Sequence, residues 1–68
     1  MRFEELKVGD KFIFDYDIED NLGFGRILFM KIKTVKDKYY SYNAIMLTGM
    51  YKGKVSAVGK YNEIIPIE

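Results

Sequence analysis

The sequence R-I-L-F-M-K-I-K-T-V, residues 26–35, is the clearest strand pattern in this chain of 68 residues. Leu28, Met30 and Ile32 lie on one side of such a strand, and that side is fully apolar. The residues between them begin apolar and end as lysines. Alternation with a period of two predicts a β-strand whose second face leaves the core and reaches a ligand or solvent.

Four further strands are predicted around this segment, at residues 11–16, 39–47, 54–58 and 62–67. They are separated by a loop over 17–25, a charged turn over 36–38, a hairpin connection over 48–53 and a tight turn at 59–60. One helical turn at most is predicted at 3–6, because V-G-D at 8–10 has turn chemistry. Pro66 confines the last strand to a sheet edge or to its own terminus.

Five short strands with glycine-marked turns predict a single all-β domain over residues 1–68. We expect a small five-stranded antiparallel barrel of SH3-like type or a strongly bent sheet. Such a barrel has little room inside for a ligand, so a binding site is expected on its surface, between loops or between subunits.

The size and composition of the chain favour assembly over catalysis. A domain of this length buries only about 60 % of its unfolded surface, and there is no Cys and no His to supply a disulfide, a zinc site or the commonest general base. We predict no catalytic residue, metal or cofactor, and no enzyme activity. Because 49 % of the residues are hydrophobic, we expect a homo-oligomer of more than two subunits, for example a tetramer.

The sequence also predicts a cytoplasmic protein without a membrane partner. No stretch approaches the roughly 20 consecutive apolar residues of a membrane span. The N-terminal sequence MRFEELKVGD is more charged than a signal peptide.

Charge is distributed unevenly along the chain. Residues 1–20 have a net charge of −4, whereas residues 21–60 have a net charge of +7 and only one acid, Asp37. The cationic stretch and its flank also contain tyrosines at positions 39, 40, 42, 51 and 61. Cations interleaved with aromatic rings fit a ligand that carries phosphates and bases. Alternatively, the lysines solvate a sheet whose tyrosines form core or cross-strand contacts, and composition alone favours that interpretation.

Several motifs follow one another in order: F-x-x-L-K-x-G-D-x-F at 3–12, F-M-K at 29–31, Y-N-A-I-x-L-T-G at 42–49 and E-I-I-P-I at 63–67. In this order they cover most of the chain and resemble small β proteins of tailed bacteriophages, in particular the anti-CBASS sponges. Those are homo-oligomers that sequester cyclic dinucleotide immune signals such as cyclic GMP-AMP. The resemblance implies a phage immune-evasion protein of the host cytosol, which binds its ligand without cleaving it at sites formed in the oligomer.

Three candidate ligand-binding residues come from the matching motifs: Lys31, Asn43 and Thr48. Lys31 would offer charge to a phosphate, Asn43 a donor and an acceptor to a base edge, and Thr48 a donor at a turn. Each also has a structural interpretation, since a lysine can extend along a strand end, an asparagine can fix a bulge and a threonine can shape a hairpin. Arg26 and Tyr42 are added from their chemistry, because a guanidinium clamps phosphate and a tyrosine ring stacks on a purine.

Two other functions stay open. One is a single-stranded nucleic-acid binder, since small barrels combine basic grooves with stacking aromatics; however, the pI of 7.9 is below the value of about 9 typical of such proteins. The other is an adaptor that inhibits a host protein by edge-strand pairing or through its charge polarity. The same polarity would also allow identical subunits to join head to tail.

Overall fold

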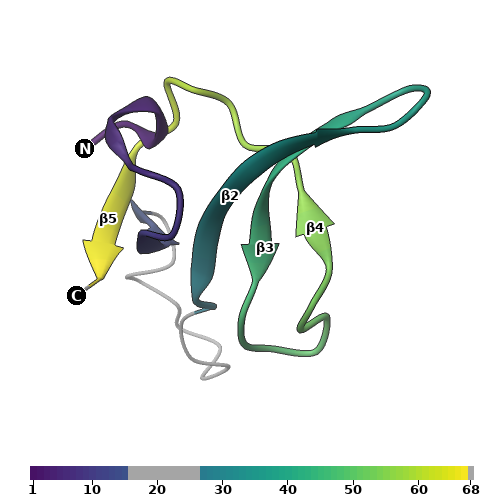
Figure 1. Cartoon of the computed structure of the whole chain (residues 1–68). Helices are drawn as coiled ribbons and strands as arrows, with labels where there is room; N and C mark the ends of the chain where they lie inside the picture. The colour runs from purple at the N-terminus through teal and green to yellow at the C-terminus, as the bar shows by residue number, and fades with distance from the viewer. Residues whose placement is uncertain (16–26, 68) are drawn as a thin grey trace.

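In residues 1–15 and 27–67, which the computed structural model describes, five antiparallel strands form an open sheet (Figure 1). The strands are β1 (Lys11–Phe14), β2 (Phe29–Lys36), β3 (Ser41–Met46), β4 (Val55–Ser56) and β5 (Ile64–Ile67). Their order across the sheet is β4-β3-β2-β1-β5, so β4 and β5 are the two edges. The all-β prediction is therefore confirmed, and the alternative of a closed barrel is wrong for the described part of the chain.

The sheet stays open because its edge strands are poor partners for each other. β4 is only two residues long, and β5 contains Pro66, which lacks the N–H that a continued ladder needs. The edge position predicted from Pro66 is thus confirmed.

β3 begins later than the strand predicted over 39–47. The Asp37 carboxylate accepts hydrogen bonds from the backbone N–H groups of Tyr39 and Tyr40, at 2.8 and 2.7 Å. These two residues therefore belong to the turn, and the strand starts at Ser41.

β4 is shorter than the strand predicted over 54–58 for a related reason. At Val58, the backbone N–H and C=O pair with the side-chain amide of Asn43, both at 2.8 Å, instead of with a backbone partner. The strand predicted over 11–16 is seen as β1 up to Phe14. The loop predicted over 17–25 lies outside the described residues.

A single 3₁₀ turn, η1 (Phe3–Glu5), precedes the sheet, in agreement with the helical turn expected there. It lays Phe3 against the centre of the core. Within residues 1–15 and 27–67, no helix has the length and apolar character needed to cross a membrane.

The hydrophobic core lies on one face of the sheet and is centred on Phe12, which is fully buried. The Phe12 ring lies 5.4 Å from the ring of Phe3 and 5.6 Å from that of Phe29, measured between centroids. Paired residues on neighbouring strands share a face, and the pairs Phe12–Phe29 and Lys31–Ala44 show that β2 turns Phe29 and Lys31 toward this core. The buried members of the core are Phe3, Leu6, Phe12, Phe29, Ala44, Val58 and Ile64.

The core-facing side of β2 differs from what the sequence suggests. The fully apolar series of Leu28, Met30 and Ile32 is only half-buried, whereas the mixed series contains the buried Phe29. Phe29 faces the core because its ring packs against those of Phe12 and Phe14. Aromatic rings in contact bury more apolar area than aliphatic side chains.

Lys31 joins η1 to the sheet. Its Nζ donates hydrogen bonds to the carbonyl oxygens of Leu6, at 2.7 Å, and Phe3, at 3.3 Å, and lies 4.7 Å from the centroid of the Phe3 ring. The lysine therefore gives a donor to the Leu6 carbonyl at the end of the turn. It is a second donor to the Phe3 carbonyl, which also accepts the backbone N–H of Leu6 at 3.1 Å.

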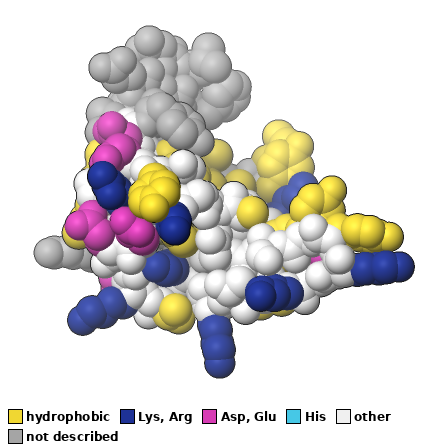
Figure 2. Space-filling view, turned by 90° about the horizontal axis from the view of Figure 1, so that it is seen from above, with side chains coloured by type: hydrophobic (Ala, Val, Ile, Leu, Met, Phe, Trp, Pro, Cys, Tyr) yellow, Lys and Arg dark blue, Asp and Glu magenta, His cyan; other side chains and the backbone are white. Residues whose placement is uncertain are grey.

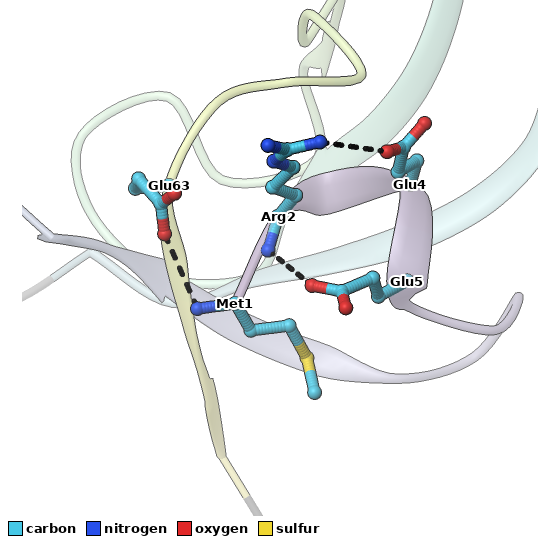
Figure 3. A network of polar contacts seen from close by, with 5 residues as sticks. All are labelled: Met1, Arg2, Glu4, Glu5 and Glu63. Atoms are coloured by element: carbon cyan, nitrogen blue, oxygen red, sulfur yellow. Dashed lines mark hydrogen bonds and ion pairs between the residues drawn. The ribbon is translucent and has the colours of Figure 1, made fainter.

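Charged groups also connect the N-terminal segment to β5 (Figure 3). The Met1 ammonium lies 3.2 Å from the Glu63 carboxylate. Arg2 donates its backbone N–H to the Glu5 carboxylate at 2.7 Å, and its guanidinium lies 3.5 Å from Glu4. These groups are exposed, so they orient the segment more than they stabilise the fold.

We predict that Lys31→Ala lowers the free energy of unfolding by about 1–3 kcal/mol, because the Leu6 carbonyl loses its donor, the Phe3 carbonyl loses one of two donors and the Phe3 ring loses a cation. Lys33→Ala is the matched control, since Lys33 is exposed and its loss should change stability by less than about 0.5 kcal/mol. Urea unfolding of both variants measures the difference. Equal effects would show that the Lys31 contacts do not hold η1 in place.

Candidate ligand-binding surface on the β2–β3 hairpin

The β2–β3 hairpin projects from the rest of the sheet (Figure 1). Its strands pair as Lys31–Ala44 and then as Val35–Tyr42, so three residues of β2 lie opposite Asn43 alone. Such a bulge bends a strand and increases its twist. Beyond it the hairpin leaves the core, and every residue from 33 to 41 is exposed.

Asp37 organises the turn at the end of the hairpin. Besides accepting the N–H groups of Tyr39 and Tyr40, its carboxylate accepts the hydroxyl of Tyr42 at 3.2 Å. The backbone hydrogen bonds from Tyr39 and Tyr40 lower the pKa of Asp37. The pKa of Tyr42 is raised, first by partial removal from water and then by its bond to Asp37. Asp37, the one acid of residues 21–60, thus uses its carboxylate to hold the turn together.

Three tyrosines follow one another along this hairpin, and we call Tyr39, Tyr40 and Tyr42 the tyrosine row. The ring centroids are 6.5 Å apart between Tyr39 and Tyr40 and 6.3 Å apart between Tyr40 and Tyr42. Tyr39 is 77 % exposed and Tyr40 is 64 % exposed, whereas Tyr42 is half-buried and fixed by its hydroxyl. Large exposed aromatic groups held together in this way mark an interaction site.

Three exposed lysines lie on the same hairpin as the tyrosine row: Lys33, Lys36 and Lys38. The Nζ of Lys38 lies 5.5 Å from the centroid of the Tyr39 ring. Figure 2 shows hydrophobic and basic side chains next to one another at the right-hand end, where the hairpin projects in Figure 1. Rings of this kind stack on bases and the ammonium groups neutralise phosphates, so the surface suits an anionic ligand that carries bases.

Of the four predicted site residues that the structure describes, only Tyr42 belongs to this surface. Lys31 is bonded to η1, and Asn43 lies opposite the bulge with its amide bonded to Val58. Thr48 accepts the backbone N–H of Leu28 on its Oγ1 at 2.9 Å. All three side chains are thus used within the fold, although the Thr48 hydroxyl keeps its hydrogen to donate, and their contact with a ligand stays a prediction. Arg26 lies outside the described residues.

Sequence reasoning did not single out Tyr39, Tyr40 or the lysines at 33, 36 and 38 as site residues. The strand predicted over 39–47 would place the rings of Tyr39 and Tyr40 on opposite faces of the sheet. Asp37 in the turn 36–38 could have indicated that Tyr39 belongs to the turn, because an aspartate in a turn commonly accepts the N–H two residues later. The bulge that carries the hairpin away from the core had no comparable signal.

Two shallow depressions lie elsewhere on the described surface. One, of about 390 Å³, is lined by Gly9, Asp10, Lys11, Pro66 and Ile67, and the other, of about 360 Å³, is lined by Phe14, Asp15, Asn62 and Glu63. Asp10 and Lys11 balance each other in the first, and the second has two acids and no basic residue, so neither has an excess of positive charge for a phosphate. The hairpin is therefore the better candidate for an anionic ligand.

The chain matches no protein-family model, and comparisons with curated proteins and with solved structures give no significant match. Of the resemblance described above, the structure supports only the fold class: a small all-β protein with a five-stranded antiparallel sheet.

We predict that the amide proton resonances of Tyr39 and Tyr40 shift in a single step in acid, with a midpoint below pH 3.8, the ordinary value for Asp37. Because the folded pKa is lowered, the ionised carboxylate stabilises the turn fully above pH 3.8, and this stabilisation is lost as the pH falls through the folded pKa. NMR titration of the wild type and of Asp37→Asn measures the step, which the variant should lack. A midpoint at or above 3.8 would contradict the assigned hydrogen bonds.

Proposed function

We propose that the protein binds a cyclic dinucleotide of the cyclic GMP-AMP type and sequesters it without cleaving it. The observation that supports this function is the exposed tyrosine row with lysines on the same hairpin. Stacking of a base on an aromatic side chain contributes about 1–3 kcal/mol. The ring of Tyr40 has tyrosines on both sides, so this is the ring we expect to stack.

The electrostatics of the hairpin fit the two phosphates of such a ligand. Lys33, Lys36 and Lys38 are exposed, while the Asp37 carboxylate is directed to the turn by three hydrogen bonds. Phosphate oxygens would therefore meet cations whose charge is not fully offset by Asp37, the only acid in the hairpin from residue 29 to residue 46. Hydrogen bonds between charged groups of this kind are roughly twice as strong as neutral ones.

A homo-oligomer of more than two subunits is part of the proposal. One hairpin covers one side of a ligand, so enclosure of a small ligand requires a second wall, which another subunit can supply. The order of the F-M-K, Y-N-A and closing motifs supports the further proposal of a phage immune-evasion role in the host cytosol.

A second candidate function is the binding of single-stranded nucleic acid. The specific observation in its favour is the openness of the hairpin surface, since successive exposed rings are how such proteins hold consecutive bases. An oligonucleotide would need no second wall.

A thermal-shift and calorimetry panel of cyclic dinucleotides, linear dinucleotides and short oligonucleotides tests the proposal. We expect a cyclic dinucleotide to raise the Tm, with about 2.7 kcal/mol of stabilisation at 100 times its Kd. Tyr40→Ala should weaken binding by about 1–3 kcal/mol through loss of stacking. The matched control is Tyr61→Ala, because Tyr61 is 62 % exposed, close to the 64 % of Tyr40, but lies outside the hairpin.

The outcomes separate the candidates. Stabilisation by oligonucleotides alone would replace the proposed function with the second one. Equal effects of Tyr40→Ala and Tyr61→Ala on affinity would remove the hairpin as the site, even if a cyclic dinucleotide binds.

We also expect the bound ligand to be recovered intact, because the sequence has no Cys or His to act as nucleophile or general base. Heat release followed by chromatography measures this. Linear product in proportion to protein concentration would instead indicate an enzyme.

A further inference from the structure

The two edges of the sheet offer different backbone groups to a partner. At β5, the N–H of Ile64 donates outward to the carbonyl of Met1 at 2.7 Å, and the N–H of Phe3 donates to the carbonyl of Asn62 at 2.9 Å. The N-terminal segment therefore covers the start of this edge. Two residues further on, the nitrogen of Pro66 faces the same side and has no hydrogen to donate. The β5 edge is thus closed to further strands.

The β4 edge has the opposite character. The carbonyl of Lys54 accepts the N–H of Met46 at 3.0 Å, while the N–H of Lys54 donates to the Tyr51 carbonyl at 2.9 Å. Ser56 is paired with Ala44 and Val58 with the Asn43 amide, so residues 56 and 58 direct their backbone groups toward β3. By alternation, the N–H and C=O groups of Val55 and Ala57 point away from the sheet. No hydrogen bond joins these four groups to another described residue, and both residues are exposed.

We propose that two copies of the chain pair through this edge, with β4 antiparallel to the β4 of the second copy. A two-fold axis at Ser56 would place Val55 opposite Ala57 of the partner subunit, and each pair would exchange two N–H···O bonds. All four outward groups of each copy are then satisfied. The two sheets become one continuous sheet, and an edge that is complementary to itself closes with two-fold symmetry.

The side chains along this edge are compatible with that register. Lys54 lies opposite Val58 of the partner subunit, so the two Lys54 ammonium groups are not placed opposite each other, which would be destabilising. Val55 pairs with Ile45, and Ile45 pairs with Met30. This apolar row on the face opposite the core ends at the β4 edge, and the pairing continues it into the second copy.

No residue of the tyrosine row takes part in this contact, so loss of the pair and loss of ligand binding at the hairpin are measured separately, although a monomeric wild type would contradict both proposals. Ala57→Pro is the decisive variant, because it removes the outward N–H of residue 57 and leaves the bonds to β3 in place. Ala57→Ser is the matched control, since it keeps the N–H. Light scattering and sedimentation of each variant measure the dissociation constant of the pair.

We expect the wild type and Ala57→Ser to form pairs or multiples of pairs at micromolar concentration. Ala57→Pro should raise the dissociation constant by at least about 100-fold, because two symmetry-related hydrogen bonds are lost and each corresponds to about a factor of ten. A wild-type monomer at several hundred micromolar would overturn the proposal, as would unchanged assembly of a folded Ala57→Pro.

Amide hydrogen exchange of the wild type gives a second test that does not depend on the folding of the variant. The amides of Val55 and Ala57 should become protected as protein concentration rises, because they are bonded only in the pair. Fast exchange of both amides in an assembled sample would show that the copies associate through another surface.

Discussion

β2 changes its register against β3 between Lys31 and Val35, and this irregularity separates the sheet that carries the core from the hairpin that carries the tyrosine row. On one side of it, Phe29 and Ala44 are buried and Lys31 is bonded to η1. On the other side, the residues face water. The core therefore packs without side chains from the end of the hairpin. The hairpin can expose tyrosines and lysines, whose polar and charged groups would cost free energy if they were buried in the core.

Polar side chains complete the backbone hydrogen bonds wherever the regular ladder stops. The Asn43 amide takes the place of a backbone partner at Val58, Thr48 accepts a backbone N–H beyond the end of β3, and Lys31 donates to the Leu6 carbonyl at the end of η1. An unpaired backbone group in a partly buried position costs about as much as a lost hydrogen bond. The motifs F-M-K, Y-N-A and T-G thus contain residues that the fold itself requires.

Much of the fold could be predicted from the sequence, because alternation at 26–35, glycine-marked turns and Pro66 are local signals. The core-facing side of β2 could not, since both of its sides begin apolar and the choice depends on contacts of Phe29 and Lys31 with distant segments. The ends of β3 and β4 were also missed, because side chains of Asp37 and Asn43 replace backbone partners there. For the same reason Lys31 and Asn43 resembled site residues, while Tyr39 and Tyr40 were assigned to a strand. Tyr42 is the predicted residue that the structure places on the candidate surface.

The exposure of the whole segment 33–41 has a consequence for how such proteins diverge. Substitutions at exposed positions usually change stability by no more than about 0.5 kcal/mol, so the tip of the hairpin, apart from Asp37, can accumulate changes almost without affecting folding. Residues such as Lys31, Asn43 and Pro66 do not have this freedom. Two proteins with the same framework can therefore differ completely in the molecule they recognise, and grafting the segment 33–42, which includes the whole tyrosine row, would transfer ligand specificity from one onto the other.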